Sequence, residues 1–404
     1  MCSVLLSYGF GIQGYNVASV IPLEGATVIQ IEQPRETLRC SACGCKKVTC
    51  KGSISRQFQA VPIGSVPVVI DFAVPRVRCS QCGLERQVAI PFADPKKGYT
   101  KSFARYVLEL SQFMTISGVA THLGIGWEVV KQIQQENLNR RFARPRLKHL
   151  TRIAIDEICV GKKHRYLTIV MDLDTGMIVY VGQGKGQKAL DAFWVRWRAS
   201  HARIQAVAAD LSPAYSAAIR KNLPRAALVF DRFHLVKLLN EHLTELRREL
   251  YNEATDMLKK NVLKGVRWLL LKRNENLEAN RNEHERLKEA LALNESLAIA
   301  YYLKEDLRQV WEQPNWLAGR EFLQDWIHRA EASGIRQLQK FAKTLAIHKE
   351  GILAWYNHPL STGPLEGTNH KIKLMQRQAY GYRDLHFFTL KLLALHMTQH
   401  ALVG

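Results

Sequence analysis

The arrangement of cysteines constrains the fold of this 404-residue chain more than any other feature. Six of the eight cysteines lie between residues 40 and 82, and four of them form two CxxC pairs, CSAC and CSQC, each followed by a glycine. This pattern is typical of a zinc knuckle, in which a tight turn points two thiolates at one ion. Two knuckles together complete a closed, tetrahedral structural site. We therefore predict that a structural Zn²⁺ is bound by Cys40, Cys43, Cys79 and Cys82.

The sequence between the two CxxC pairs predicts strands, because QFQAVPIG and VPVVIDFAVPRVRC are rich in Val, Ile and Pro. The separation of 35 residues exceeds the usual spacing, so a long hairpin must lie between the knuckles. Disulfides are the main alternative, but a cytoplasmic protein rarely keeps them, and a redox CxxC would not occur twice. Replacement of one ligand by Cys45 or Cys50 stays open. We assign residues 1–95 to a zinc-ribbon domain.

Residues 101–138 repeat apolar side chains at three- and four-residue steps, which predicts helices. The pattern breaks at LGIG, where Gly124 permits a sharp turn. A short helix, a glycine turn and a second helix make a helix-turn-helix, whose second helix enters the major groove of DNA. Lys131 on this second helix is a candidate contact to DNA. The alternative is a plain helical hairpin that packs on a core.

The formal net charge of +21 makes an acidic polymer the natural partner, although charge alone also suits any soluble basic protein. The charge is concentrated in residues 140–152, where thirteen positions hold six Lys or Arg. This run is either a solvated linker or a set of phosphate contacts. We favour DNA binding and assign residues 96–150 to a helix-turn-helix domain with a basic linker. The candidate contacts in the linker are Arg140, Arg141, Arg144, Arg146 and Lys148.

From residue 151 the pattern changes to β-rich runs, first as a meander and then in alternation with helices, which predicts a mixed sheet flanked by helices. Asp156 lies inside the first apolar strand and Asp210 ends the fourth. An acid in an apolar strand is costly unless it is paired or metal-bound. Two such acids on one sheet suit a pair of Mg²⁺ ions in phosphoryl transfer. Either aspartate alone would be interpreted as a strand-end cap or part of a surface turn, and Asp172 and Asp174 in MDLDTG are assigned to such a hairpin turn.

After the fifth strand, the helical period continues to residue 350 and predicts an all-α insertion over 238–350. Its tryptophans are interpreted mainly as core residues, although an exposed ring is able to stack on an unpaired base; they are Trp268, Trp311, Trp316 and Trp326. A last helix follows STGP. Its basic side chains are either a solvated face or contacts to the scissile phosphates; they are Lys371, Lys373 and Arg377.

The order of the zinc ribbon, the helix-turn-helix and the segments AIDE, AADLSPAY, VFDRFHLVK and STGPLEGTNHKIKLMQRQAYGYRD resembles the ISL-type insertion-sequence transposases of the DDE superfamily. The resemblance covers nearly the whole chain. It implies a ribonuclease-H-like catalytic domain, formed by residues 151–237 and 351–404. It also implies a catalytic and metal-binding triad of Asp156, Asp210 and Glu366, with supporting roles for Asp231, His234 and Asn369.

The expected architecture is a multidomain α/β protein, in which a ribonuclease-H-like mixed sheet carries the all-α insertion and follows a β-rich zinc ribbon and a helix-turn-helix. The implied function is a DNA transposase that binds the terminal inverted repeats of its element, cleaves the ends and joins the 3′-hydroxyl to target DNA. Two Mg²⁺ or Mn²⁺ ions serve the triad, and the partners are double-stranded DNA and further copies of the chain, as a homodimer or larger assembly. The alternatives are an inactive DNA-binding regulator and a metal-dependent nuclease without strand transfer. Without a long apolar run or a signal peptide, we expect a cytoplasmic, nucleoid-associated protein.

Overall fold

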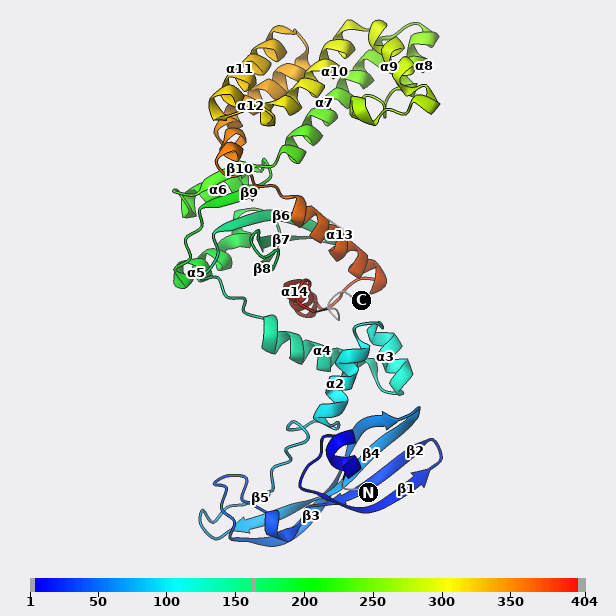
Figure 1. The fold of residues 1–404 in the computed structure, drawn as a ribbon, viewed down its shortest axis with the longest axis vertical. Coiled ribbons are helices and arrows are strands. Elements are labelled where there is room, and N and C mark those ends of the chain that lie inside the picture. The colour runs from blue at the N-terminus through cyan, green and yellow to red at the C-terminus, as the bar shows by residue number, and fades with distance from the viewer. Residues whose placement is uncertain (1–3, 162–164, 399–404) are drawn as a thin grey trace. The chain divides into compact units, whose positions relative to one another are not determined.

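The computed structural model describes residues 4–161 and 165–398, and Figure 1 shows their fold. The chain forms two compact units, one of Met1–Ala143 with Met375–Gly404 and one of Arg144–Leu374. The first unit thus combines the N-terminal part of the chain with its last helix. In the described part of the chain, no helix is both long and apolar enough to cross a membrane.

The first unit begins with a short π-helix, η1 (Leu5–Gly9), and a twisted sheet. Its strands are β1 (Asn16–Leu23), β2 (Ala26–Glu32), β3 (Val48–Ile63), β4 (Val66–Cys79) and β5 (Glu85–Gln87), and the short helix η2 (Arg35–Thr37) follows β2. The strand order is β1-β2-β4-β3, with β5 paired to β4. The antiparallel β3–β4 pair is the long hairpin that the cysteine spacing predicted. Edge-to-face contacts of Phe92 with Tyr15 and Phe58 fill the core beneath it.

The helices of the first unit are α2 (Lys101–Leu110), α3 (Ile116–Leu123), α4 (Trp127–Phe142) and α14 (Leu385–Ala394). Thr100 and Thr115 cap α2 and α3 by accepting hydrogen bonds from backbone N–H groups. Gly124 ends α3 with a φ of 62°, a left-handed conformation that glycine adopts without strain. The predicted helix-turn-helix is therefore present as α3, the glycine turn and α4. The last helix, α14, packs against α4.

The second unit is built on a mixed sheet of β6 (Arg152–Gly161), β7 (Arg165–Asp172), β8 (Ile178–Gln183), β9 (Ala206–Ala209) and β10 (Ala227–Phe230). The order is β10-β9-β6-β7-β8: β6, β7 and β8 form an antiparallel meander, and β9 and β10 run parallel to β6. Helices η3 (Gln187–Leu190), α5 (Asp191–Ser200) and α6 (Pro213–Asn222) bury Phe193, Trp194 and Tyr215 against one face. This arrangement confirms the predicted mixed sheet flanked by helices.

The helical insertion follows β10. It consists of α7 (Arg232–Glu253), α8 (Met257–Gly265), η4 (Asn274–Asn276), η5 (Ala279–Arg281), α9 (Glu283–Ala292), α10 (Glu295–Leu307), η6 (Arg308–Trp311), α11 (Trp316–Ala332) and α12 (Arg336–Leu353). Its core includes the fully buried Trp326 and Phe341. The chain returns to the sheet at Gly351, where an added Cβ would lie 2.4 Å from the ring of Phe230. The predicted all-α insertion is thus present, with helices that begin at Arg232 and end at Leu353. After η7 (Ala354–Tyr356), helix α13 (Gly363–Gln378) follows.

Candidate metal centres and active site

The two cysteine pairs meet at one point of the first unit. The Sγ atoms of Cys40 and Cys82 lie 3.7 Å apart, and those of Cys43 and Cys79 lie 3.6 Å apart. Tetrahedral coordination with Zn–S bonds of about 2.3 Å separates the sulfur atoms by roughly 3.8 Å. All four Sγ atoms lie within 4.8 Å of one another, so the set fits a zinc ion and no disulfide is formed by these cysteines.

The backbone of each knuckle donates hydrogen bonds to the sulfur atoms of its cysteines. Gly44 and Gly83 have φ values of 73° and 70°, which allows each turn to close behind its CxxC pair. Backbone N–H groups then point at the sulfur atoms, and the hydrogen bond from Cys82 N–H lowers the pKa of the Cys79 thiol to about 6. Cys45 instead accepts a hydrogen bond from Lys47 N–H, 3.3 Å away. Within residues 4–161 and 165–398, the metal-ligand group therefore contains the four predicted cysteines and neither Cys45 nor Cys50.

The two candidate aspartates of the second unit occupy neighbouring positions on adjacent strands, Asp156 within β6 and Asp210 directly after β9. In the parallel pairing of β6 with β9, Ile155 lies opposite Ala209, so Asp156 and Asp210 are the next residues on adjacent strands. Strands in a sheet are about 4.8 Å apart. Asp156 continues in β6, opposite Ile169 of β7, whereas Asp210 leaves the sheet and accepts a hydrogen bond from Ser212 N–H, at 3.0 Å. The sheet thus brings together the two acids that the sequence singled out.

The carboxyl group of Asp156 is electrostatically strained. Burial, with the negative charges of Asp210 and Glu157, raises its pKa from 3.8 to about 6, against hydrogen bonding from Glu157 N–H and the charge of His234. A divalent cation would relieve this cost, because it replaces repulsion between carboxylates by attraction to a common positive charge. The residues therefore fit a magnesium or manganese site.

Helix α13, which carries Glu366, contacts the same strand through Asn369. Asn369 Nδ2 donates a hydrogen bond to Asp156 Oδ2, at 3.0 Å. Glu366 lies in the first turn of α13, three residues before Asn369, and residues at this spacing share one helix face. Asn369 Oδ1 is buried and, in the described part of the chain, has no hydrogen-bond partner, so it offers a further oxygen beside Asp156. The carboxylates of the triad do not approach one another as closely as the cysteines do: among the described residues, only the cysteines form a group within 4.8 Å.

The supporting residues of the D-x-x-H pattern lie where α7 begins. Asp231 is buried at 2% exposure, and His234 Nδ1 is 4.0 Å from its Oδ2 atom. His234 also lines a cleft of about 190 Å³ with Asp210 and Ser212, together with Lys237 of the same helix. The structure thus places His234 in a cleft beside Asp210, whereas Asp231 lies beneath the surface.

Sequence reasoning missed a polar network on the opposite face of β6. Glu157 follows Asp156, and side chains alternate along a strand, so its carboxylate points away from α13. The buried Tyr215 hydroxyl donates to Glu157 Oε2 at 3.0 Å and lies 3.0 Å from Thr168 Oγ1. Tyr215 belongs to the quoted AADLSPAY segment, and the period of two in AIDE was a signal that Glu157 faces a different environment.

The basic side chains proposed to contact DNA are exposed. Those of the linker end α4 or follow it, and those of α13 lie on the helix that carries Glu366; they are Arg140, Arg141, Arg144, Arg146 and Lys148, and Lys371, Lys373 and Arg377. Lys131 differs, because its Nζ lies 2.8 Å from Asp384 Oδ2 and 5.6 Å from the ring centre of Phe387. A contact of Lys131 with a base would therefore require it to leave this ion pair.

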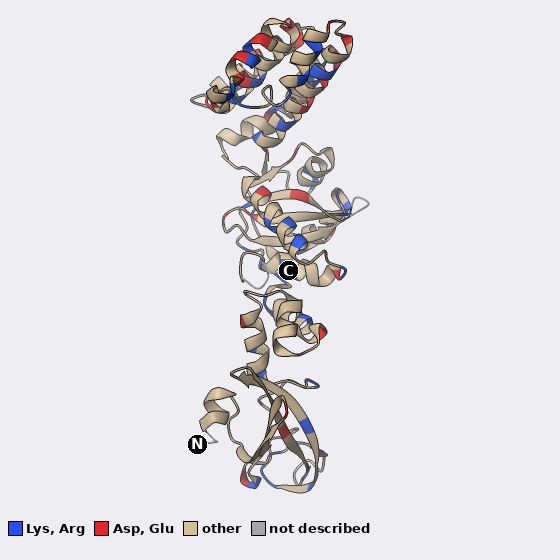
Figure 2. Cartoon of the chain, turned by 90° about the vertical axis from the view of Figure 1, so that its right-hand side faces the viewer, with Lys and Arg blue, Asp and Glu red and all other residues tan. Residues whose placement is uncertain are grey.

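The helical insertion is almost neutral. Residues 238–350 hold 19 Lys or Arg and 18 Asp or Glu, so nearly all of the net charge of +21 lies elsewhere in the chain. Figure 2 shows both signs interspersed on these helices. Of the four tryptophans, Trp311 and Trp326 are buried as expected, while Trp268 is 65% exposed with the guanidinium of Arg267 over its ring. Trp268 is thus the ring that meets the condition for stacking on a base.

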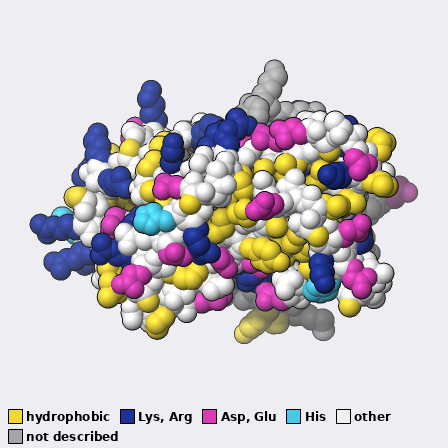
Figure 3. Space-filling view, turned by 90° about the horizontal axis from the view of Figure 1, so that it is seen from above, with side chains coloured by type: hydrophobic (Ala, Val, Ile, Leu, Met, Phe, Trp, Pro, Cys, Tyr) yellow, Lys and Arg dark blue, Asp and Glu magenta, His cyan; other side chains and the backbone are white. Residues whose placement is uncertain are grey.

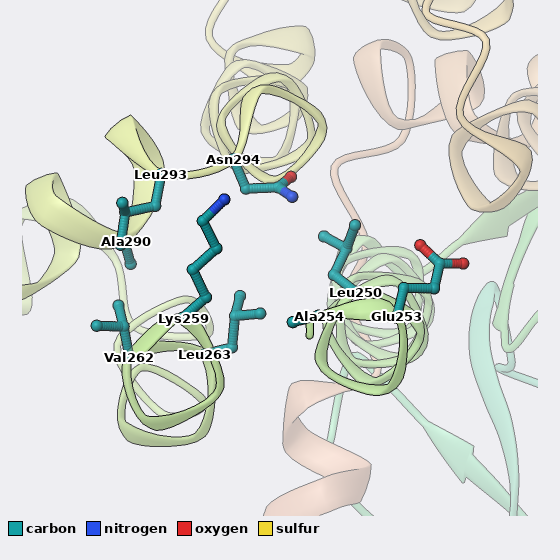
Figure 4. Close-up of a pocket in the computed structure, with 9 residues that line it drawn as sticks. All are labelled: Leu250, Glu253, Ala254, Lys259, Val262, Leu263, Ala290, Leu293 and Asn294. Carbon is teal, nitrogen blue, oxygen red and sulfur yellow. The ribbon is translucent and has the colours of Figure 1, made fainter. Parts of the chain in front are cut away.

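The insertion also contains apolar surface and a pocket. Figure 3, viewed from the side of α8–α12, shows hydrophobic side chains in the middle of this face. A pocket of about 210 Å³ lies between α7, α8 and the α9–α10 turn, and Figure 4 shows Lys259 and Asn294 pointing into it among leucine, valine and alanine side chains. Its lining includes a single acid, Glu253, so it offers no set of metal ligands. Asp156, Asp210 and Glu366, and not this pocket, therefore stay the candidate metal site.

Comparisons with known proteins identify the family. Residues 153–392 match a transposase domain of the ISL3 family, residues 88–136 match the helix-turn-helix domain of transposase family ISL3, and residues 36–82 match the zinc finger of the transposases of IS204, IS1001, IS1096 and IS1165. The chain is 33% identical to the transposase for insertion sequence element IS1001 of Bordetella parapertussis over 95% of this chain and 96% of that protein. It is 31% identical to the transposase for IS1557 of Mycobacterium tuberculosis, over 89% of this chain and 86% of that one.

Among solved structures, the Drosophila P element transposase strand transfer complex aligns with a TM-score of 0.39 and 9% identity, over 74% of this chain and 92% of that chain. The sequence matches cover the zinc ribbon, the helix-turn-helix and most of the second unit, in the order in which the structure shows them. This chain belongs to the ISL3 family of insertion-sequence transposases.

Proposed function

We propose that this transposase cleaves and joins DNA at a site formed by Asp156, Asp210 and Glu366, with two Mg²⁺ ions. The observation that carries the proposal is the hydrogen bond between Asn369 and Asp156, since it brings the helix of Glu366 to the strand on which Asp156 lies next to Asp210. When bound, Mg²⁺ supplies a Lewis acid that activates the attacking oxygen and stabilises the leaving oxygen.

The residues around the triad have separate tasks in this proposal. Asn369 orients the carboxylate of Asp156. The exposed Lys371, Lys373 and Arg377 lie on the same helix and attract the phosphates that flank the scissile bond. His234 lines the cleft beside Asp210 and adds a proton donor or acceptor close to the reacting strand.

Recognition of the element ends is assigned to the rest of the chain. The zinc ribbon (1–95) and the helix-turn-helix with its basic linker (96–150) bind the terminal inverted repeats. The catalytic domain (151–237 and 351–404) cuts the strand and directs the freed 3′-hydroxyl at target DNA, and the neutral insertion (238–350) contributes few phosphate contacts. Two ends must be held together for joining, so we propose that a homodimer or larger assembly acts on DNA in the cytoplasm, at the nucleoid.

The test is incubation of the purified protein with duplexes of its own element ends, Mg²⁺ and target DNA. We expect nicked ends and joined products. Asp156→Asn, Asp210→Asn and Glu366→Gln should each reduce nicking by at least a thousandfold while end binding stays within about twofold, because charge at the metal site is lost and shape is kept. Asp174→Asn is the matched control, since Asp174 lies in the β7–β8 turn. Nicking retained in a triad variant removes that residue from the site. Binding without any nicking by the wild-type protein would favour the DNA-binding regulator, and nicking without joining would favour the nuclease.

A further inference from the structure

One buried carboxylate links three segments that surround the proposed active site. Asp231 follows β10, and its backbone N–H donates to the carbonyl oxygen of Ala209, at 3.3 Å, directly before Asp210. Its Oδ1 atom accepts from Phe233 N–H, at 3.1 Å, and so caps α7. Its Oδ2 atom accepts from both the N–H, at 3.0 Å, and the hydroxyl of Thr362.

Thr362 lies immediately before α13 and is 131 residues away from Asp231 in the chain. Its carbonyl oxygen accepts a hydrogen bond from Glu366 N–H, at 2.9 Å. The carboxylate of Asp231 thus holds the residue that begins α13, and this residue in turn holds the backbone of Glu366. We call Asp231 and Thr362, with their hydrogen bonds, the α7–α13 junction.

The junction is buried, with both side chains 2% exposed. A buried charge is retained only where donors satisfy it, and here two backbone N–H groups, one hydroxyl and the N-terminal end of the α7 dipole do so. Hydrogen bonds to a charged group are stronger than those between neutral groups. Because it is covered in this way, Asp231 does not reach the surface at which Asp156 and Asp210 meet.

We propose that Asp231 is a positioning residue, which sets the start of α13 and therefore the carboxylate of Glu366 relative to Asp210. The helical insertion separates Asp210 from Glu366 by 155 residues, so the third acid needs a fixed point at the place where the chain returns. The α7–α13 junction supplies this fixed point, because Asp231 lies where the chain leaves the sheet and binds Thr362, which directly precedes α13. This inference rests on the proposed role of Glu366 in catalysis.

The test uses full-length protein and two readouts. Thr362→Val removes the hydroxyl donor and keeps the shape, Thr362→Ser keeps the donor, and Asp231→Asn removes the charge. Thr175→Val is the matched control, because Thr175 Oγ1 donates to Asp172 Oδ2, at 2.6 Å, in a turn of the same unit. The first readout is amide hydrogen exchange of residues 362–369 without metal, and the second is the rate of end nicking over a Mg²⁺ series.

We expect exchange of residues 362–369 to become at least tenfold faster in the Thr362→Val and Asp231→Asn variants, and to stay within twofold for Thr362→Ser and Thr175→Val. Nicking at low Mg²⁺ should slow at least tenfold in the first two variants with end binding unchanged. The double variant Asp231→Asn/Thr362→Val should nick DNA no more slowly than Asp231→Asn alone, because both changes break the same α7–α13 junction.

Unchanged exchange and nicking in Thr362→Val would overturn the proposal. Faster exchange with unchanged nicking would overturn it as well, since the junction would then be structural without positioning Glu366. If the wild-type protein does not nick, the proposed function fails, and unchanged exchange in both variants would separately overturn the junction.

Discussion

Replacement of Asp156 by Asn should stabilise the metal-free protein at neutral pH. The folded state raises the pKa of Asp156 from 3.8 to about 6, mainly by burial. A folded-state pKa above the unfolded value means that the folded chain binds the proton more tightly. The electrostatic cost is therefore absent below pH 3.8, grows between pH 4 and pH 6, and is complete above pH 6.

The expected change in unfolding free energy follows from this pKa shift. About two pKa units correspond to roughly 3 kcal/mol of unfolding free energy. The Asp156→Asn variant would also lose one acceptor, because Asp156 now accepts from both Glu157 N–H and Asn369 Nδ2, and this costs about 1 kcal/mol at every pH. Between pH 4 and pH 7, the unfolding free energy of the variant should thus rise by about 3 kcal/mol relative to that of the wild type. At pH 7 the variant should be more stable by about 2 kcal/mol, because the lost acceptor costs about 1 kcal/mol.

The assay is thermal unfolding of both proteins over this pH range, in buffer from which Mg²⁺ and Mn²⁺ have been removed by dialysis without a chelator, so that the zinc site stays occupied. A change of 1 kcal/mol shifts the midpoint by about 2–4 °C in a domain of this size, so the midpoint difference should change by roughly 6–12 °C. Added Mg²⁺ should stabilise the wild type and not the variant.

The control for this comparison is Asp174→Asn. Although burial acts to raise its pKa, hydrogen bonds from Thr151 and Arg152 lower the pKa of Asp174, so its pH dependence should have the opposite sign. A midpoint difference between Asp156→Asn and the wild type that is flat from pH 4 to pH 7 would refute the assignment of Asp156 as the strained carboxylate of the site.

Three further outcomes are expected. Purified protein should contain about one Zn²⁺ per chain, and Cys79→Ser should lose it and unfold the ribbon selectively; metal analysis that finds no zinc would contradict this. Neutralising Arg144 and Arg146 should weaken binding to element-end DNA and to random DNA alike. It should also lower the slope of log binding constant against log salt concentration by about one per lost contact. If only binding to the element ends is weakened, these two residues contact bases and not phosphates. Gly351→Ala should destabilise the second unit by about 1–3 kcal/mol through a clash with Phe230; an unchanged unfolding midpoint would refute this.

Local sequence patterns were sufficient where the chemistry is local. The doubled CxxC pairs predicted the metal site, because four thiolates at this spacing have few other uses. Apolar strands interrupted by Asp156 and Asp210 predicted a pair of acids at one sheet, and the register of β6 with β9 confirms that they are neighbours. The turn at Gly124 likewise followed from the left-handed backbone that a glycine permits.

Contacts between distant segments were beyond such patterns. Nothing near Asp231 indicates that its partner is Thr362, 131 residues later, and nothing near Lys131 indicates Asp384. Glu366 lies in the first turn of a helix, where an acid is also expected simply because it suits the helix dipole. Its role came from resemblance and not from periodicity. Pairings of this kind depend on tertiary packing, which a single sequence does not reveal.

The central claim is that one metal site is formed by Asp156, Asp210 and Glu366. Its most direct test is anomalous scattering from Mn²⁺ in crystals of the protein bound to its element-end DNA. We expect manganese at about 2.0–2.2 Å from carboxylate oxygens of all three residues, and loss of that signal in the Glu366→Gln variant. Manganese bound elsewhere, or bound at the two aspartates with Glu366 turned away and DNA in place, would contradict it.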